Sequence, residues 1–329
     1  MGLTGSAILQ LHPTRRCNLR CLHCYSESGP YVAATTPLGV LCDAVTDAAE
    51  LGYTVVSISG GEPLLYPQLV GLLRHAKSLG VGTTVTSNGM LMTERRLGEL
   101  AGLVDVLALS LDGRPETHDR MRGDARAFRT LDSRVAGIRA SGIPFGFITT
   151  LTMDNVAEVE WVVGYAKERG AGLVQIHPLE PEGAAVRNLE DSVPDLTESA
   201  FAVIEGARLE ASYDLTVQVD IARRSELVGH PREFLVEAPT AQARLSEWLT
   251  PLVVETDGTV VPLTYGFPHR YALGSLHRHR LRTLADRWDP TSFLDLTRRV
   301  GLRLGEDPRP LFNWYDELAA EARLALASV

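Results

Sequence analysis

The chain has 329 residues, of which 45% are hydrophobic and 22% charged, and a formal net charge of −9. This composition is typical of a globular protein with one large domain or one domain and an appendage. The acidic balance leaves no electrostatic footprint for nucleic acid, and no run of 18 apolar residues could span a membrane. The clustered cysteines and the absence of a signal-peptide pattern predict a cytoplasmic protein whose thiols bind a metal.

Strand-like and helix-like segments alternate through residues 7–177. We expect strands at residues 7–11, 53–58, 81–86, 104–109, 145–151 and 172–177, and helices at 37–51, 67–79, 93–103, 127–141 and 155–169. Such alternation with short connections predicts parallel strands joined by crossover helices. Six units fit an α/β fold, a partial (βα)6 TIM-like barrel, in which ligand sites gather at the carboxyl ends of the strands.

The alternation changes after about residue 185. Residues 195–210 are expected to be helical, and residues 252–255 and 260–262 predict a hairpin with Asp257-Gly258 as its turn. More helices are expected up to the end of the chain. We therefore divide the chain into a barrel at residues 1–185 and a small α+β C-terminal extension at residues 186–329.

Three of the four cysteines follow the first expected strand. Cys17, Cys21 and Cys24 have the spacing C-x3-C-x2-C, so three thiolates can turn toward one soft metal centre and leave one coordination position open. An iron–sulfur cluster normally has four cysteine ligands, and with three of them one iron is free to bind another group. The alternative is a zinc-stabilised binding protein in which His12 or His23 is the fourth ligand.

The cysteine spacing, together with Gly60-Gly61-Glu62-Pro63 after the second expected strand, resembles the radical S-adenosylmethionine (radical SAM) superfamily over about residues 5–180. The resemblance implies a [4Fe-4S] cluster on Cys17, Cys21 and Cys24, with SAM chelating the free iron. One electron then cleaves SAM into methionine and a 5′-deoxyadenosyl radical, which abstracts a hydrogen atom from a substrate. A low-potential electron donor of the flavodoxin or ferredoxin type is implied as a partner.

Further polar strand ends match family positions that contact SAM. Residues 86–89 resemble the family's T-x-N-G strand end, and residues 110–113 resemble its S-x-D-G strand end. His23 stands where the family places a residue beside the adenine, and Arg122 is implied to pair with the SAM carboxylate. Turn capping by Ser, Asn and Asp is the alternative at the strand ends. The full implied set of SAM-binding residues is His23, Gly60, Gly61, Glu62, Pro63, Ser87, Asn88, Ser110, Asp112, Arg122 and Thr150.

Two other groups have weaker assignments. Gln175, His177 and Glu180 lie at the end of the sixth strand, where they could contact substrate or adenine, or could simply belong to the rim. Cys42 falls on the first expected helix and is most simply a small buried hydrophobic residue, with a thiol hydrogen donor as the alternative.

The C-terminal region resembles the SPASM or twitch extension of radical SAM enzymes at residues 257–262 and 271–276. Leu263 stands where that extension has a cysteine, and no cysteine follows Cys42. We therefore expect a SPASM-like scaffold without auxiliary clusters, with a generic hairpin as the alternative. The cluster at Cys17–Cys24 is then expected to be the only redox centre.

The substrate is expected to be a small molecule or a natural-product intermediate. The first strand begins by about Ala7, so no leader-peptide-binding domain is expected before the barrel. Without an auxiliary cluster as electron acceptor, a redox-neutral outcome such as epimerisation, elimination or decarboxylation is favoured. Modification of a ribosomally made peptide is the alternative.

Overall fold

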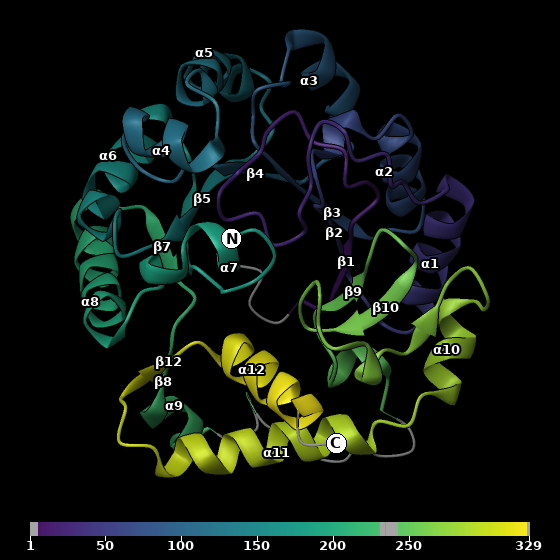
Figure 1. Ribbon diagram of the computed structural model, residues 1–329. Coiled ribbons are helices and arrows are strands. Elements are labelled where there is room, and N and C mark those ends of the chain that lie inside the picture. Colours follow the sequence, from purple (N-terminus) through teal and green to yellow (C-terminus); the bar gives the residue numbers. More distant parts are fainter. Residues whose placement is uncertain (1–5, 231–233, 235–242, 328–329) are drawn as a thin grey trace.

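A computed structural model describes residues 6–230, 234 and 243–327. One sheet of ten strands organises the molecule, in the order β11-β10-β9-β1-β2-β3-β4-β5-β6-β7. Seven of these strands form a parallel series, which curves into an incomplete barrel (Figure 1). They are β1 (Ile8–Leu11), β2 (Val55–Ile58), β3 (Gly82–Ser87), β4 (Val106–Ser110), β5 (Phe145–Leu151), β6 (Leu173–Pro178) and β7 (Thr216–Val219).

Helices cover the outside of the parallel strands (Figure 1). The six expected strands and the five expected helices are all confirmed, to within a few residues at their ends. The structure adds a short helix and a seventh parallel strand, α4 and β7, which the sequence did not predict. The helices of this layer are α1 (Leu38–Glu50), α2 (Leu69–Ser78), α3 (Glu94–Leu100), α4 (Pro115–Arg122), α5 (Ala127–Ala140), α6 (Val159–Arg169) and α8 (Leu196–Tyr213).

The C-terminal region adds strands to the edge of the barrel sheet beside β1. β9 (Leu252–Val254) pairs in parallel with β1, and β10 (Thr259–Pro262) and β11 (Gly274–Ser275) continue the sheet in antiparallel fashion. The hairpin with Asp257-Gly258 in its turn is confirmed, and Gly258 has φ +80°, a conformation that glycine adopts without strain.

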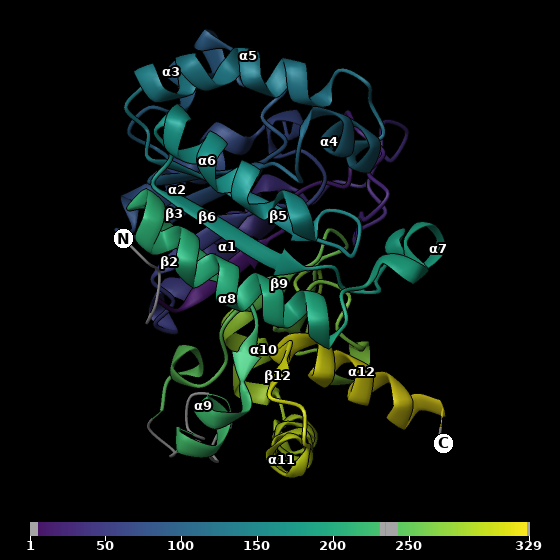
Figure 2. The same ribbon diagram turned by 90° about the vertical axis from the view of Figure 1, so that its left-hand side faces the viewer.

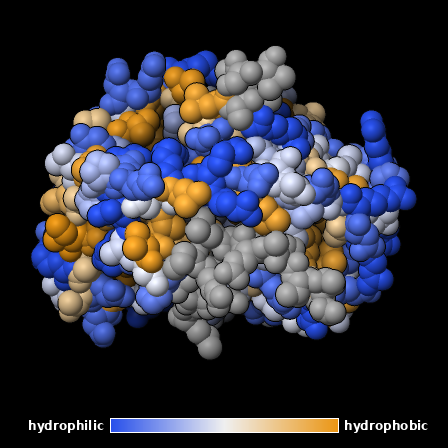
Figure 3. Space-filling model, turned by 90° about the horizontal axis from the view of Figure 1, so that it is seen from below, coloured by the Kyte–Doolittle hydropathy of each residue, from blue (hydrophilic) through white to orange (hydrophobic). Residues whose placement is uncertain are grey.

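Three of the remaining helices lie below the barrel as neighbours, namely α9 (Arg224–Gly229), α11 (Thr291–Glu306) and α12 (Trp314–Ala327) (Figure 2). In Figure 1, α12 lies between the β7 edge and the hairpin edge of the open barrel. Seen from below, the surface is largely polar with separate apolar patches (Figure 3). The other elements are α7 (Ala185–Asn188), α10 (Leu281–Arg287) and an antiparallel pair of β8 (Ala222–Arg223) and β12 (Leu311–Phe312).

The two faces of the barrel strands differ in chemistry. Leu11, Ile58 and Ile176 are fully buried in the core shared with the helices. Side chains of a strand alternate between the two faces of the sheet. Gln10, Ser57 and the other strand residues that alternate with the core residues therefore face the barrel interior. These interior residues are only half-buried, as are Thr86, Thr150, Gln175 and His177. The interior is therefore polar and is not packed shut by large apolar side chains.

In the part of the chain that the structure describes, no helix is both long and apolar enough to cross a membrane.

Candidate active site

The cysteine loop, residues 12–36, connects β1 to α1 at the carboxyl end of the barrel strands. Cys17 is buried, and Cys21 and Cys24 are half-buried. The Cys17 N–H donates to the carbonyl of Gly29 at 3.1 Å, which closes the loop on itself. A loop held in this way presents the three thiols at the strand ends, where barrel enzymes place their active sites.

Each of the three sulfurs already faces a nitrogen donor. The N–H of Leu19 lies 3.5 Å from Cys17 Sγ, and the N–H of Ser28 lies 3.2 Å from Cys24 Sγ. Arg122 Nη1 lies 3.8 Å from Cys21 Sγ. Hydrogen bonds to the sulfurs are among the factors that set the reduction potential of an iron–sulfur cluster. The donor arrangement of this loop therefore fits a cluster.

The thiols of Cys17 and Cys21 are not thiolates on their own at neutral pH. Burial raises the pKa of Cys17 to about 12 and that of Cys21 to about 11. A coordinated metal deprotonates a thiol outright, so cluster binding would supply the thiolate form. Within residues 6–230, 234 and 243–327, no three His, Cys, Asp or Glu side chains are grouped so that they could hold a single metal ion.

The glycine pair after β2 packs against the cysteine loop. The Gly61 N–H donates to the carbonyl of Thr14 at 2.8 Å, and the Glu62 N–H donates to that of Arg16 at 2.9 Å. Gly60 has φ +111°, and a Cβ on Gly61 would overlap the Arg16 carbonyl group. Glycine is therefore required here because the backbone of the cysteine loop passes so close, whatever part Gly60 and Gly61 also take in binding SAM.

Glu62 connects the ends of β2 and β3. Its carboxylate is fully buried and accepts hydrogen bonds from the N–H of Leu64 at 3.1 Å, the hydroxyl of Ser87 at 2.9 Å and the N–H of Asn88 at 3.0 Å. Burial raises the pKa of Glu62, and these hydrogen bonds oppose the shift. Both oxygens thus have partners within the protein, and Pro63 begins the turn that follows. Direct contact of Glu62, Pro63 or Ser87 with SAM stays a prediction.

Asn88 ties β3 to the cysteine loop. Its Nδ2 donates to Oδ1 of Asn18 at 2.9 Å, and Asn18 lies directly after Cys17. Sequence reasoning did not select Asn18, although its position inside the cysteine motif was a signal. The T-x-N-G strand end is therefore fixed to the cysteine loop by a side-chain hydrogen bond.

Asp112 and Arg122 form a buried ion pair. Arg122 Nε lies 2.6 Å from Asp112 Oδ2, and Nη2 lies 2.9 Å from Oδ1. Burial opposes the charge on Asp112, but Arg122 outweighs it and lowers the pKa of Asp112 to about 2. His118 Nδ1 accepts the Asp112 N–H at 3.2 Å, and burial lowers the pKa of His118 to about 4, so this imidazole is neutral. The guanidinium that was predicted to meet the SAM carboxylate thus already has a carboxylate partner.

The other predicted SAM contacts lie around the same rim. Ser110 is buried at the end of β4, and the Thr150 N–H donates to Asp112 Oδ1 at 3.3 Å. Burial lowers the pKa of His23 to about 4, and its buried Nδ1 has no hydrogen-bond partner in the described part of the chain. An unpaired buried nitrogen is costly, so it indicates a position that a ligand can satisfy.

His12 is a second buried imidazole without polar partners. It ends the first strand region at 0% exposure, and neither ring nitrogen has a hydrogen-bond partner among the described residues. Its ring centroid lies 4.6 Å from that of Tyr265 and 5.8 Å from that of Tyr25. Burial lowers its pKa to about 3. Sequence reasoning considered His12 only as a zinc ligand, and could not foresee Tyr265 beside it.

A second polar group lies where β6 and β7 end. His177 Nδ1 lies 3.2 Å from Asp220 Oδ2 and Nε2 lies 3.4 Å from Glu180 Oε1, while Gln175 Nε2 donates to Asp220 at 2.5 Å. Burial opposes protonation of His177, but the two carboxylates outweigh it and raise its pKa to about 10. Asp316 of α12 lies close enough to this group that, after burial as the main cause, Glu180 helps to raise its pKa to about 6 while His177 opposes the shift. We call His177, Glu180, Asp220 and Asp316 the acidic rim.

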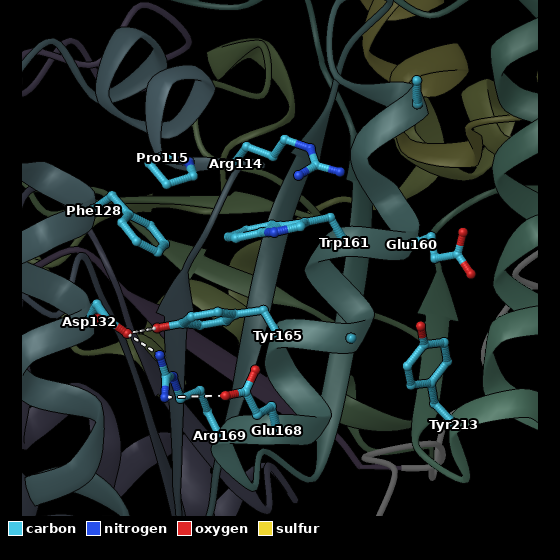
Figure 4. Close-up of a pocket in the computed structure, with 12 residues that line it drawn as sticks. Arg114, Pro115, Phe128, Asp132, Glu160, Trp161, Tyr165, Glu168, Arg169 and Tyr213 are labelled. Atoms are coloured by element: carbon cyan, nitrogen blue, oxygen red, sulfur yellow. Dashed lines mark hydrogen bonds and ion pairs between the residues drawn. The ribbon is translucent and has the colours of Figure 1, made fainter.

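Two further features lie away from the strand ends. Cys42 lies on α1, half-buried against the hydrophobic core, as a small apolar residue would. A hollow of about 590 Å³ lies on the helical side of the barrel, where Trp161 and Tyr165 stack at 5.3 Å (Figure 4). Its polar groups pair with one another, since Asp132 accepts from Tyr165 at 2.8 Å and contacts Arg169 at 2.9 Å (Figure 4).

Fold and site together define a class: an open parallel barrel with a three-thiol loop after its first strand. Residues 11–166 match the family model described as the radical SAM superfamily. The similarity to this superfamily therefore covers residues 11–166, which include the three-thiol loop and the turn after β2.

Curated relatives share the same part of the chain. An AdoMet-dependent heme synthase of Methanosarcina barkeri is 31% identical over 55% of this chain and 53% of its own length. A PqqA peptide cyclase of Gluconobacter oxydans is 34% identical over 59% of this chain and 56% of its own. The chain spans about half to two thirds of the length of the curated relatives it matches.

Solved structures show the same fold. SuiB of Streptococcus suis, bound to precursor peptide SuiA, aligns with a TM-score of 0.68 over 86% of this chain and 65% of its own, at 16% identity. A structure of anSMEcpe with bound AdoMet and a peptide aligns with a TM-score of 0.67 over 98% of both chains, at 19% identity. Radical SAM enzymes use a [4Fe-4S] cluster and SAM, and the three-thiol loop fits the cluster.

Proposed function

We propose that this chain is an enzyme that binds one [4Fe-4S] cluster through Cys17, Cys21 and Cys24 and cleaves SAM reductively at the strand ends of the barrel. The observation that carries the proposal is the set of three sulfurs, each facing a nitrogen donor, beside the Gly60–Pro63 turn. When bound, the cluster supplies the electron that cleaves SAM to the 5′-deoxyadenosyl radical. The polar interior holds the substrate, and the protein orients the reactants and limits access of water.

For the substrate we favour a peptide. The acidic rim carries three carboxylates against one imidazolium, so it would repel carboxylate-rich molecules and accept N–H or ammonium groups. The similarity to PqqA peptide cyclases, and the fold shared with structures that hold peptides, support this choice. A small biosynthetic intermediate, the first expectation from the sequence, is the second candidate, supported by the similarity to heme synthases.

We also propose where the electron enters. Arg16 and Arg20 directly precede Cys17 and Cys21 and are exposed, and the Arg20 guanidinium lies 5.0 Å from the ring centroid of Tyr31, which is 87% exposed. An acidic electron-transfer protein of the flavodoxin or ferredoxin type would be steered to this surface in a reducing, cytoplasmic setting. Raising the salt concentration is then expected to slow reduction by that protein but not by dithionite.

The chemistry is tested by anaerobic reconstitution with iron and sulfide. The wild type is expected to take up four irons and four sulfides and to form 5′-deoxyadenosine from SAM and a reductant. Cys21→Ala is expected to lose both properties, and Cys42→Ala, at a thiol away from the loop, is expected to keep both. A cluster-loaded wild type that forms no 5′-deoxyadenosine would contradict the proposal.

The substrate class is tested with deuterated candidates encoded or made by neighbouring genes. A peptide substrate is expected to transfer deuterium into 5′-deoxyadenosine, and Glu180→Gln combined with Asp220→Asn is expected to raise its KM more than it lowers kcat. Transfer from a small molecule but not from any peptide would favour the second candidate.

A further inference from the structure

The C-terminal end of α4 is fixed to the cysteine loop. The Leu22 N–H donates to the carbonyl of Met121 at 2.9 Å, and Leu22 directly follows Cys21. Gly123, which caps α4 with φ +67°, lies so close to the loop that a Cβ there would be 2.5 Å from the carbonyl oxygen of Arg20. Arg122 stands between these two contacts. Its backbone therefore has a fixed position relative to Cys21.

The Arg122 guanidinium divides its donors between two partners. Nε and Nη2 bind both oxygens of Asp112, and Nη1 points to Cys21 Sγ at 3.8 Å. Asp112 is 0% exposed and Arg122 is 8% exposed, so water screens this arrangement little. Asp112 also accepts the Thr150 N–H, which keeps the carboxylate in place. The result is an ion pair whose positive end faces a cluster ligand.

Such an arrangement acts on the reduction potential of a cluster. Reduction adds one negative charge, and nearby positive charge and hydrogen bonds to sulfur stabilise the more negative state. Asp112 opposes Arg122 in this respect, because its carboxylate disfavours the added charge. His118, whose pKa burial lowers, is neutral and adds no charge beside this pair at neutral pH.

We propose that Arg122 and Asp112 set the reduction potential of the cluster from the Cys21 side. Arg122 is a positioning residue that raises the reduction potential through its contact with the Cys21 sulfur. Asp112 lowers the potential, because its carboxylate partly offsets the positive charge of Arg122. This role differs from the SAM carboxylate contact implied by the family resemblance. The inference rests on the proposed function, since it requires the cluster.

The test is an EPR-monitored redox titration of the reconstituted protein without SAM. Asp112→Asn is expected to move the potential in the positive direction. The double variant Asp112→Asn with Arg122→Met removes both charges together, which buried pairs tolerate better than loss of one partner. It is expected to lower the ratio of reduced to oxidised cluster at least tenfold relative to Asp112→Asn, which is about 59 mV for one electron. Arg122→Lys, which keeps the charge, is expected to stay near the wild type.

A matched control comes from the same helix. Arg120 and Asp154 form an ion pair at 3.3 Å in which both side chains are nearly half exposed. Arg120→Met with Asp154→Asn removes the same two charges away from the sulfurs and is expected to leave the potential unchanged. Removing Asp112 and then Arg122 is expected to shift the reduction potential in opposite directions. A general loss of structure would not produce shifts of opposite sign.

Two outcomes would overturn the inference. One is an unchanged potential in both Asp112→Asn and the double variant, with normal iron content. The other is a double variant whose only defect is an affinity for SAM lowered tenfold or more, which would assign Arg122 to the SAM carboxylate. A wild type that takes up no cluster would instead contradict the proposed function.

Discussion

Gly61 has no side chain, and this lets the backbone of the cysteine loop pack directly against it. Its N–H binds the carbonyl of Thr14, and its α-carbon faces the backbone of Arg16. Gly61→Ala is expected to displace the loop, to reduce iron content after reconstitution by more than half, and to lower Tm, because backbone cannot yield as a flexible side chain can.

Gly98 provides the control for this substitution. It lies in α3 with open space around its α-carbon, and alanine favours helix over glycine by about 0.8–1.0 kcal/mol. Gly98→Ala is therefore expected to keep full iron content and to raise Tm slightly. Equal iron content in the two variants would show that the Gly61 contact is dispensable.

Asp316 makes the stability of the protein depend on pH. Burial, followed by Glu180 and Glu317, raises the pKa of Asp316 to about 6. The folded state therefore holds the Asp316 proton more tightly than the unfolded state. The resulting contribution to the free energy of unfolding is complete below about pH 4 and is lost as the pH rises through 6. Asp316→Asn is expected to be more stable than the wild type by about 1–2 kcal/mol at pH 7.5 and nearly equal at pH 4.

Urea denaturation at several pH values measures this difference. Asp286→Asn, at an exposed position on α10, is the control and is expected to track the wild type at every pH. A difference between Asp316→Asn and the wild type that stayed constant from pH 4 to 7.5 would contradict the assignment.

The placement of the three cysteines in one loop, next to the Gly60–Pro63 turn, could be predicted from the sequence, and their part in holding a cluster stays a prediction. The three cysteines and the Gly60–Pro63 turn follow strands, and parallel strands end at one edge. The hydrogen bonds of Glu62 to Ser87 and Asn88, and of Arg122 to Asp112, could not be predicted, because they form between side chains of different segments. Contacts such as that of His12 with Tyr265 join residues far apart in the chain and leave no local pattern.

At the scale of elements, the C-terminal end of α4 packs against the cysteine loop and holds it in place. Gly123→Ala is expected to strain the left-handed cap and also to push on the Arg20 carbonyl. Gly142 has φ +74°, but a Cβ added there would meet nothing within 4 Å, so Gly142→Ala carries the backbone strain alone. Gly123→Ala is therefore expected to lower the free energy of unfolding by about 1 kcal/mol or more beyond the loss caused by Gly142→Ala.

Urea denaturation of the two glycine variants, together with their iron content, checks this prediction. Gly123→Ala is expected to bind less iron, and Gly142→Ala is expected to bind as much as the wild type. Equal stability and equal iron content would mean that α4 does not hold the loop.

The alternation of strands and helices predicted the barrel because the strands are short runs rich in apolar and β-branched residues, separated by segments with helical spacing. It did not predict α4, whose sequence PETHDRMR is almost wholly polar. It also did not predict β7, because Thr216 and Gln218 are exposed and leave little apolar signal in four residues. Both are short elements stabilised by tertiary contacts, and local pattern is weakest for these.

For the molecule as a whole, SAM binding is expected to stabilise the folded state only when the cluster is present. A ligand that binds only the folded protein adds about 2.7 kcal/mol at a concentration of 100 Kd. Anaerobic thermal unfolding of the reconstituted wild type is expected to show this shift. The triple variant Cys17→Ala, Cys21→Ala, Cys24→Ala is expected to show little of it, and an equal shift there would mean that SAM binds without the cluster.

The pairing of β9 with β1 has a consequence for biosynthesis. Thr256 Oγ1 binds the carbonyl of His12 across 244 residues of chain, and Thr250 Oγ1 accepts the N–H of Ile8 across 242. A ribosome makes residues 8–24 early. β9, the second neighbour of β1 in the sheet, emerges only when most of the chain has been synthesised. Contacts of such sequence separation form late in folding. The sheet on both sides of β1, which leads into the cysteine loop, is therefore completed only after β9 has been synthesised.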